Sequence, residues 1–199
     1  MLILILSLVL TPTLALGMFN GNVSIRMNSG EQKLLIEKTA PVWCLKWDPT
    51  EEEAFDTLAV GCWDQTLSFY NMNGGEVGVQ NLNYNPCDIS YYSSPDDSRA
   101  GSYLLVSGSN KKVSMMTREG VKLADICERE SWIWTCTPRP YTNYVAVGTN
   151  DGNISMHQLL FSTVHAMYQD RYAYRDNMTD VVVQHLITDK KVKIKHKDY

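Results

Sequence analysis

The sequence predicts an all-β fold, a partial β-propeller that forms an open arc of about four blades. A hairpin-like segment recurs four times with a period of 41 to 46 residues, which is the length expected of one four-stranded blade. An alternating strand rich in β-branched and aromatic residues precedes three of the four copies. Short turn sequences recur in register between these strands, so each copy carries the parts of a small antiparallel sheet.

The four copies of the hairpin align without gaps. They cover residues 14–25, 58–69, 104–115 and 145–156, and each ends in an apolar-Ser-apolar triplet whose serine is Ser24, Ser68, Ser114 or Ser155. Within each copy an apolar strand, a turn and an alternating second strand follow one another, which is the pattern of a β-hairpin.

Eight positions in these hairpins are predicted to serve the repeat structure. The first strand ends at a small residue, which lets neighbouring chain approach closely; the turn that follows contains Asn or Asp, which tolerate tight-turn geometry. The small residues are Gly17, Gly61, Ser107 and Gly148, and the turn residues are Asn20, Asp64, Asn110 and Asp151. We assign all eight to folding and none to chemistry.

The remaining strands of each blade are also visible. Residues 42–49, 86–93 and 132–138 alternate as innermost strands, while residues 31–37 and 121–126 are weaker outer strands. Their tryptophans, Trp43, Trp47, Trp132 and Trp134, are expected to pack between blades rather than to contact a ligand. The organisation is typical of WD40-type propellers.

Three segments are expected along the chain: an atypical apolar leader (1–13), a partial first propeller (14–176) and the start of a second propeller (177–199).

The leader looks somewhat like a signal peptide, but no Lys or Arg precedes its apolar run, and cleavage after Ala15 would cut the first repeat. We expect that it displaces the first blade's inner strand, that the ring stays open and that the isolated chain is prone to aggregate. A helical turn is possible at residues 164–170.

Composition and motifs argue against nucleic-acid binding and catalysis. The net charge is −4, and the one dense basic run, 190–197, alternates with apolar residues as a strand with one solvated face would; a nucleic-acid patch is the alternative. The acidic loops 50–56 and 93–101 are expected to be solvated, or else to bind a basic partner.

Five cysteines without C-x-x-C spacing indicate buried free thiols, and the sequons at Asn22, Asn153 and Asn177 are expected to be unmodified. No catalytic, metal or cofactor motif is present, so no catalytic, metal-binding or cofactor-binding residue is assigned.

One string goes beyond a generic repeat. Residues 161–195, FSTVHAMYQDRYAYRDNMTDVVVQHLITDKKVKIK, resemble the stretch between the first and second propellers in the WD-repeat subunits of intraflagellar transport complex A. LALGMFNGNVSIR, SWIWTC and NYVAVGTNDGNISMHQL resemble the same family in the same order, so the match covers residues 14–197. Residues 1–13 do not resemble it, and the family proteins are several times longer, as a fragment or truncated gene prediction would explain.

The resemblance implies a non-enzymatic scaffold in the cytoplasm, cilium and ciliary base. It implies roles in retrograde transport, delivery of ciliary membrane proteins and cilium assembly, with other propeller and helical-repeat subunits of the complex as partners, and without nucleic acid or direct membrane insertion. It assigns no partner-binding residue. The alternatives are an adaptor of another cytosolic assembly, such as a ubiquitin-ligase substrate receptor, and a secreted enzyme or lectin-like propeller.

Overall fold

The computed structural model describes residues 5–8, 13–49, 57–93, 103–160, 165–175 and 180–195. These residues form antiparallel strands and turns, and no helix occurs among them. It follows that this part of the chain contains no helix long and apolar enough to cross a membrane. The chain divides into two compact units, Met1–Leu159 and Leu160–Tyr199.

Unit 1 contains four sheets, each an up-and-down meander in chain order. Blade 1 comprises β1 (Ile5–Leu8), β2 (Thr13–Gly17), β3 (Asn22–Met27) and β4 (Gln32–Glu37); blade 2 comprises β5 (Val42–Trp47), β6 (Thr57–Cys62), β7 (Thr66–Asn71) and β8 (Glu76–Asn81). Blade 3 comprises β9 (Pro86–Tyr92), β10 (Tyr103–Gly108), β11 (Lys112–Met116) and β12 (Lys122–Glu128); blade 4 comprises β13 (Ile133–Pro138), β14 (Tyr144–Thr149) and β15 (Ile154–Gln158).

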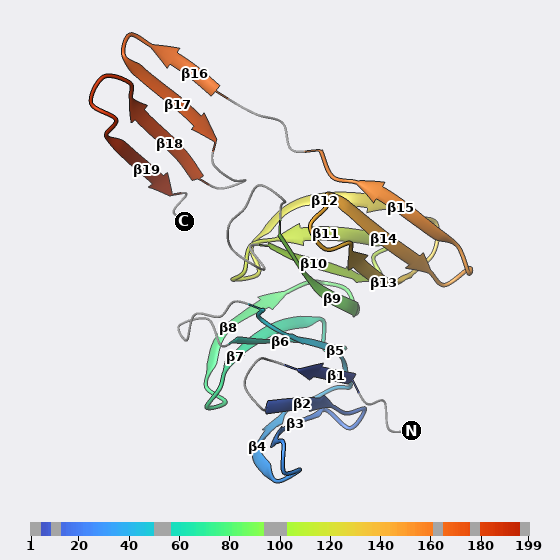
Figure 1. The fold of residues 1–199 in the computed structure, drawn as a ribbon. Helices are drawn as coiled ribbons and strands as arrows, with labels where there is room; N and C mark the ends of the chain where they lie inside the picture. Colours follow the sequence, from blue (N-terminus) through green and yellow to red (C-terminus); the bar gives the residue numbers. More distant parts are fainter. Residues whose placement is uncertain are drawn as a thin grey trace. The chain divides into compact units, whose positions relative to one another are not determined.

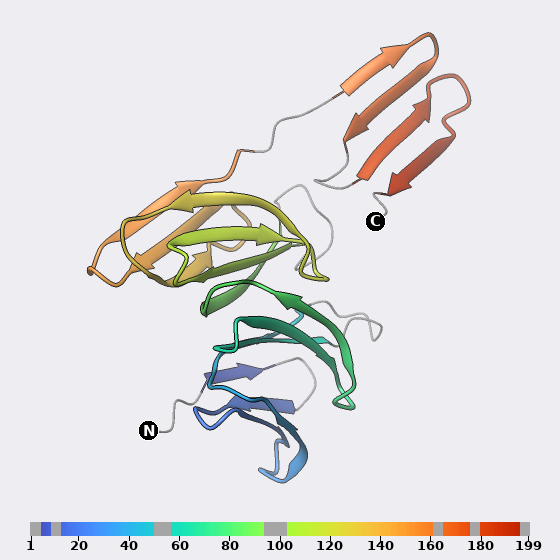
Figure 2. The same cartoon turned by 180° about the vertical axis from the view of Figure 1, so that it is seen from behind.

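The four blades of unit 1 follow one another around an open arc (Figures 1 and 2). Their first strands lie on the inside, where β1 contacts β5, β5 contacts β9 and β9 contacts β13. The predicted all-β fold and open propeller arc are therefore confirmed. The acidic loops predicted at 50–56 and 93–101 lie outside the described residues except for Ser93.

The core of unit 1 lies between neighbouring blades. One buried cluster joins Val23 and Ile25 of blade 1 to Leu45 and Leu58 of blade 2. A second joins Phe69 of blade 2 to residues of blade 3. Alternation along each strand supplies apolar side chains to both faces of a sheet, and packing the sheets face to face buries them.

The leader differs from its expected role. Residues Ile5–Leu8 form β1, which pairs with β2 in register Ile5↔Gly17 to Leu8↔Leu14. Blade 1 therefore has an inner strand, and the apolar segment supplies it instead of displacing it. An apolar run of this length suits a strand that is enclosed by a sheet as well as it suits a leader.

Unit 2 is one four-stranded sheet, formed by β16 (His165–Tyr168), β17 (Arg171–Arg175), β18 (Asp180–His185) and β19 (Lys191–Lys195). The helical turn considered for residues 164–170 is wrong, because His165–Tyr168 is the strand β16. The expected domain boundary after residue 176 falls between β17 and β18, which pair within this sheet.

The basic run of unit 2 forms a strand, as its alternation predicts, but both of its faces meet solvent. Val192 is 63% exposed and Ile194 is 55% exposed, so the apolar face is not covered. Lys193 pairs with Asp180 at 2.8 Å. The lysines therefore occupy a solvated face, as the alternation predicts, and the apolar side chains of the other face are exposed as well.

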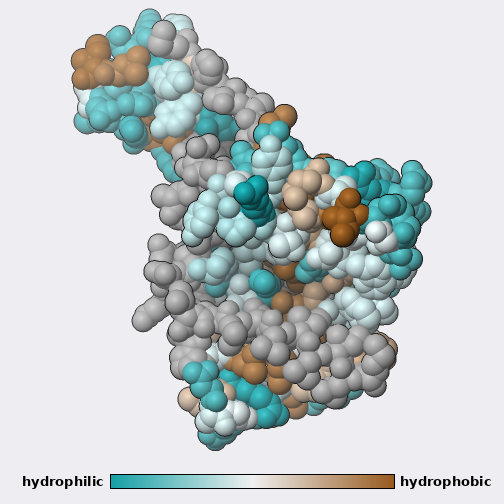
Figure 3. All heavy atoms as spheres, turned by 45° about the vertical axis from the view of Figure 1, so that its right-hand side comes forward, coloured by the Kyte–Doolittle hydropathy of each residue, from teal (hydrophilic) through white to brown (hydrophobic). Residues whose placement is uncertain are grey.

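Apolar side chains also remain exposed at the last blade of unit 1. Strand β15 pairs only with β14 in the described part of the chain, and its Ile154 is 85% and its Met156 60% exposed. Figure 3 shows hydrophobic atoms, in brown, at the surface among mostly polar ones. An unpaired strand edge with exposed apolar side chains favours association between chains.

We therefore expect the isolated chain to associate through this edge. In size-exclusion chromatography it should elute mainly as assemblies, and Ile154→Lys, which places a charge on the edge, should increase the monomer fraction several-fold. Tyr141→Lys, at a position that is 95% exposed in a turn, is the control and should leave the profile unchanged. A monomer peak of the unaltered chain with a cooperative melt above about 60 °C, beyond the middle of the usual mesophile range, would contradict this expectation.

Candidate functional site

The hairpin turns of the four blades share one geometry. Each turn is closed by a backbone hydrogen bond of 3.1 or 3.2 Å, for example from Gly21 N to Met18 O and from Gln65 N to Cys62 O. The residue after the Asn or Asp has positive φ in every blade: Gly21 (93°), Gln65 (68°), Lys111 (63°) and Gly152 (83°). This is a tight turn followed by one left-handed residue, a common three-residue hairpin loop.

The predicted turn residues hold this geometry through their side chains. The Oδ1 atoms of Asn20, Asp64 and Asn110 accept hydrogen bonds from the backbone N–H two residues later, at 3.1, 3.1 and 3.3 Å. Asp151 accepts from the side chains of Thr149 and Asn153 and from the backbone N–H of Asn153. Short polar side chains that bond the backbone in this way stabilise turns.

The predicted small residues lie at the ends of β2, β6, β10 and β14, close to neighbouring chain. A Cβ on Gly17 would lie 2.8 Å from side-chain atoms of Val42 and Leu45, and one on Gly148 would lie 2.8 Å from Thr135 Cγ2. A Cβ on Gly61 would overlap Cys44 Sγ. Ser107 is fully buried. All four positions therefore have little or no room for a larger side chain.

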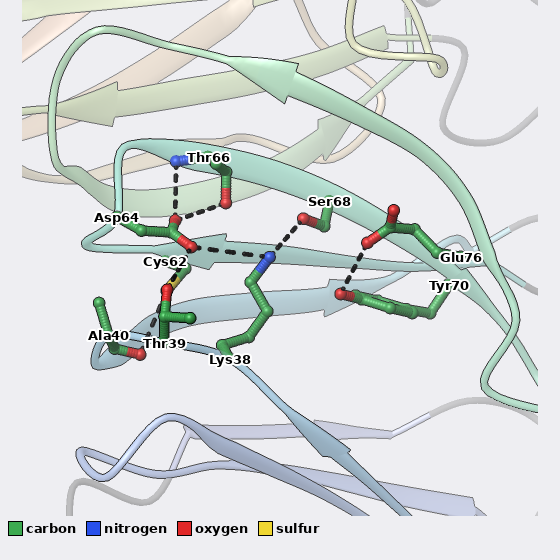
Figure 4. Close-up of polar contacts among 9 residues, drawn as sticks. All are labelled: Lys38, Thr39, Ala40, Cys62, Asp64, Thr66, Ser68, Tyr70 and Glu76. Atoms are coloured by element: carbon green, nitrogen blue, oxygen red, sulfur yellow. Dashed lines mark hydrogen bonds and ion pairs between the residues drawn. The ribbon is translucent and has the colours of Figure 1, made fainter.

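A lysine links blade 1 to the turn of blade 2 (Figure 4). Lys38 follows β4, and its Nζ donates to Ser68 Oγ at 2.9 Å and lies 3.8 Å from Asp64 Oδ2. Burial alone would raise the pKa of Asp64, but hydrogen bonds from Thr66 and Cys62 and the Lys38 charge outweigh it and lower that pKa. Asp64 therefore stabilises the folded state near neutral pH, and this contribution is lost as the pH falls.

The same link recurs between blades 3 and 4. Arg129 follows β12 as Lys38 follows β4, four residues before the next inner strand, and its Nη2 donates to Ser155 Oγ at 2.8 Å. Both residues also donate their backbone N–H to the left-handed turn residue of the preceding blade, Lys38 to Gly21 and Arg129 to Lys111. The triplet serines could be recognised in the sequence, but the basic residues that bind Ser68 and Ser155 were not identified there. The sequence signal that could have found them is a basic residue four positions before an inner strand.

A bulge interrupts the inner strands of blades 2, 3 and 4 near their start. The pairing jumps from Val42 to Cys44 in β5 and from Ile133 to Thr135 in β13, so that Trp43 and Trp134 are the extra residues. The corresponding extra residue in β9 is Cys87. A bulge re-aims the side chain of its extra residue away from the regular alternation.

The bulges help to bring four tryptophans together at the turn end of the arc, which is the end that carries the hairpin turns. We call Trp43, Trp63, Trp132 and Trp134 the tryptophan cluster. Trp43 stacks on Trp63 with ring centroids 4.3 Å apart, and it lies 5.6 Å from Trp134. Trp132 and Trp134 are 5.8 Å apart and tilted by 46°. These separations are those of interacting aromatic rings.

The predicted packing of tryptophans between blades is seen where Trp43 of blade 2 lies against Trp134 of blade 4, but part of the cluster also reaches the surface. Trp47 is buried between blades 1 and 2, as expected, but Trp43 and Trp134 are half-buried and Trp132 is 36% exposed. The indole N–H of Trp63 donates to Pro86 O at 3.1 Å, and that of Trp134 donates to Asn150 Oδ1 at 2.8 Å. The rings are thus fixed in orientation while part of their surface meets solvent. Trp63, which lies in a turn, was not singled out in the sequence.

The cysteine thiols lie in environments that disfavour the reactive thiolate. All five cysteines are free; four are buried and Cys127 is only half-buried, which corrects the prediction for that residue. Burial raises the pKa of each thiol, that of Cys87 to about 12, so the reactive thiolate is scarce at neutral pH. In the described part of the chain no three His, Cys, Asp or Glu side chains lie together as metal ligands.

A buried ion pair joins blades 2 and 3 at the opposite end. Arg118, in the turn between β11 and β12, donates from Nε at 3.0 Å and from Nη2 at 2.5 Å to the carboxylate of Asp48, which follows β5. The Asp48 side chain is only 3% exposed. Two-pronged contacts between guanidinium and carboxylate fix orientation as well as charge, so this pair sets the position of one blade on the next.

Taken together, consecutive antiparallel blades of three or four strands and recurrent hairpin turns define a β-propeller repeat protein. Residues 11–158 match the family model described as the IFT122 first beta-propeller, and residues 165–199 match the IFT122 second beta-propeller. The chain therefore belongs to the IFT122 family. The predicted start of a second propeller is confirmed by the second match.

Curated relatives agree with this assignment. The chain is 52% identical to the intraflagellar transport protein 122 homolog of Mus musculus, 51% to that of Xenopus tropicalis and 49% to that of Danio rerio, in each case over 92% of this chain. The match covers 15% of the length of each of these relatives, so the chain corresponds to a short part of them.

The turn geometry predicts different costs for two glycines. Gly21 and Gly152 occupy the same turn position with positive φ, but a Cβ on Gly21 would overlap Lys38 O, whereas one on Gly152 meets nothing within 4 Å. Gly152→Ala should lower the free energy of unfolding by about 1 kcal/mol, from backbone strain alone, and Gly21→Ala should lower it clearly more. Urea unfolding followed by tryptophan fluorescence measures both. Gly78→Ala, in a strand with ordinary backbone, is the control, and equal losses at positions 21 and 152 would refute the role of the contact.

The ion pair between blades predicts a large effect of one substitution. Arg118→Met removes the guanidinium group that pairs with the buried Asp48 carboxylate and should destabilise the chain by about 3–5 kcal/mol. The double variant Asp48→Leu with Arg118→Met removes both charges and should recover much of that loss. Lys122→Met, which breaks the exposed pair with Asp125, is the matched control and should change stability by less than about 1 kcal/mol. Thermal unfolding of the unaltered chain and the three variants measures these effects. A loss of stability in Arg118→Met no larger than in Lys122→Met would contradict a stabilising role of the ion pair between blades 2 and 3.

Proposed function

We propose that the chain is part of a non-enzymatic scaffold subunit of intraflagellar transport complex A. The observation that carries this proposal is the order of two family matches, the first propeller at residues 11–158 and the second at 165–199. Their identity to named intraflagellar transport proteins supports it. In this role the protein acts in retrograde ciliary transport, in delivery of ciliary membrane proteins and in cilium assembly.

The partners we propose are the other propeller and helical-repeat subunits of that complex, and the sites of action are the cytoplasm, the cilium and the ciliary base. Propellers suit such a role because their loops present a broad, rigid surface without any need for chemistry. The raised thiol pKa values and the internal use of Lys38, Asp64 and Arg129 fit a structural rather than a catalytic protein.

We also propose that the eight repeat positions serve folding rather than chemistry. The four small residues allow close approach at strand ends, and the four turn residues bond the hairpin loop. Partner choice then rests chiefly on side chains that vary between the blades.

Expression of the tagged chain in ciliated cells tests the scaffold role. We expect the chain to concentrate at the cilium and ciliary base and to co-purify with other subunits of the complex, because the propeller surface is retained. Arg118→Met, which weakens the contact between blades 2 and 3, should reduce co-purification, while Lys122→Met should not. Diffuse staining together with recovery of ubiquitin-ligase subunits would favour the adaptor function instead.

A further inference from the structure

The tryptophan cluster is a feature that the proposed scaffold role does not use. Its rings come from two inner strands, one turn and one connecting segment of blades 2 and 4, and they meet at the turn end of the arc. Fixed aromatic rings with partly exposed surface are typical of the residues that dominate protein interfaces.

The geometry of the rings suits a flat cation. The Trp43–Trp63 stack has an interplanar angle of 16°, whereas Trp134 is tilted by 42° to Trp43 and by 46° to Trp132. The cluster thus offers indole faces in more than one direction. Indole faces attract cations through the ring quadrupole, and a guanidinium group also stacks on them.

Two acidic residues lie close to members of the cluster along the chain. Asp151 follows Asn150, the residue that holds the Trp134 N–H, and its hydrogen-bond partners Thr149 and Asn153 are neutral. Hydrogen bonding, chiefly from Thr149, keeps the pKa of Asp151 below its ordinary value, so it is ionised at neutral pH. Glu130, two residues before Trp132, is exposed.

The neighbouring cations are already engaged. Lys38 is bound to Ser68 and lies 3.8 Å from Asp64, beside Trp63. Arg129 is bound to Ser155 and His157. Its partners are neutral, so Arg129 keeps its positive charge. The charged residues next to Trp132 and Trp134 along the chain, Glu130, Asp151 and Arg129, nevertheless sum to one negative charge, which favours a cationic ligand and disfavours the phosphates of a nucleic acid.

We propose that the tryptophan cluster binds an arginine side chain presented by an extended peptide segment of a partner protein. The guanidinium group stacks on the exposed indole surface of Trp132 and Trp134, with Glu130 and Asp151 supplying the opposite charge. This inference does not depend on the proposed transport role, because the cluster would bind the peptide in any assembly that contains this propeller.

Fluorine NMR of the full 199-residue chain tests the proposal. The chain has five tryptophans, so labelling with 5-fluorotryptophan gives five resonances, which single Trp→Phe substitutions assign. The chain is fused to a soluble carrier protein that lacks tryptophan, which counters its expected association. The buried Trp47 is an internal control for folding and for non-specific effects.

The probe is the peptide acetyl-Gly-Ser-Gly-Arg-Gly-Ser-Gly-amide, and its matched control carries citrulline, which keeps the shape but lacks the charge. We expect saturable shifts of Trp132 and Trp134 with the arginine peptide, an apparent Kd at least about five-fold lower than with citrulline, and no shift of Trp47. Equal shifts with both peptides, or none at saturation, would overturn the proposal. Shifts with an oligothymidine but not with the arginine peptide would overturn it in favour of nucleic acid.

Two variants separate the rings from the charge. Trp132→Ala should abolish the shift of Trp134, whereas Tyr141→Ala, which removes an exposed aromatic ring outside the cluster, should not. Glu130→Gln should reduce the preference for arginine over citrulline and leave the Trp47 resonance in place. If the preference survives in Glu130→Gln and in Asp151→Asn, the acidic residues do not select the ligand and the proposal is wrong.

Discussion

Each sheet of the arc has two apolar faces, and both must be covered by a neighbour. This requirement places the core between blades, where Leu45 and Leu58 of blade 2 meet blade 1 while Phe69 packs toward blade 3. It also explains why the inner strands contact one another in chain order. Where no further blade follows within the unit, apolar side chains of β15 such as Ile154 and Met156 stay exposed, which is the physical meaning of an open arc.

The turn end of the arc combines repetition with variation. Every blade uses the same hairpin loop, in which a left-handed residue follows Asn or Asp. Glycine fills that position in blades 1 and 4, whereas Gln65 and Lys111 fill it in blades 2 and 3 at some cost in backbone strain. The bulge of the inner strand likewise recurs, but its extra residue is a tryptophan in blades 2 and 4 and Cys87 in blade 3. The hairpin loop and the inner-strand bulge thus recur between blades, while the side chains that they present differ around the arc.

Several charged residues in unit 1 connect neighbouring blades. Lys38 and Arg129 reach serines of the following blade, and Arg118 reaches back to Asp48 of the preceding one. Such pairs contribute position and orientation where apolar packing alone would allow sheets to slide. Membership of the IFT122 family and the proposed scaffold role agree with this use of charge, because a scaffold must hold its surfaces in fixed relation.

The sequence by itself determined the hairpins, their period, the residues of the turns and the family, because alternation and turn chemistry are local and act within a few residues. Tertiary structure alone decided which distant residues meet. Asp48 and Arg118 are 70 residues apart, and Trp43 and Trp134 lie on separate blades, so no local pattern brings them together. The pairing of Ile5–Leu8 with β2 is of the same kind, because an apolar run by itself does not specify a partner strand. These contacts depend on how twisted sheets stack on one another, which is a property of the folded chain as a whole.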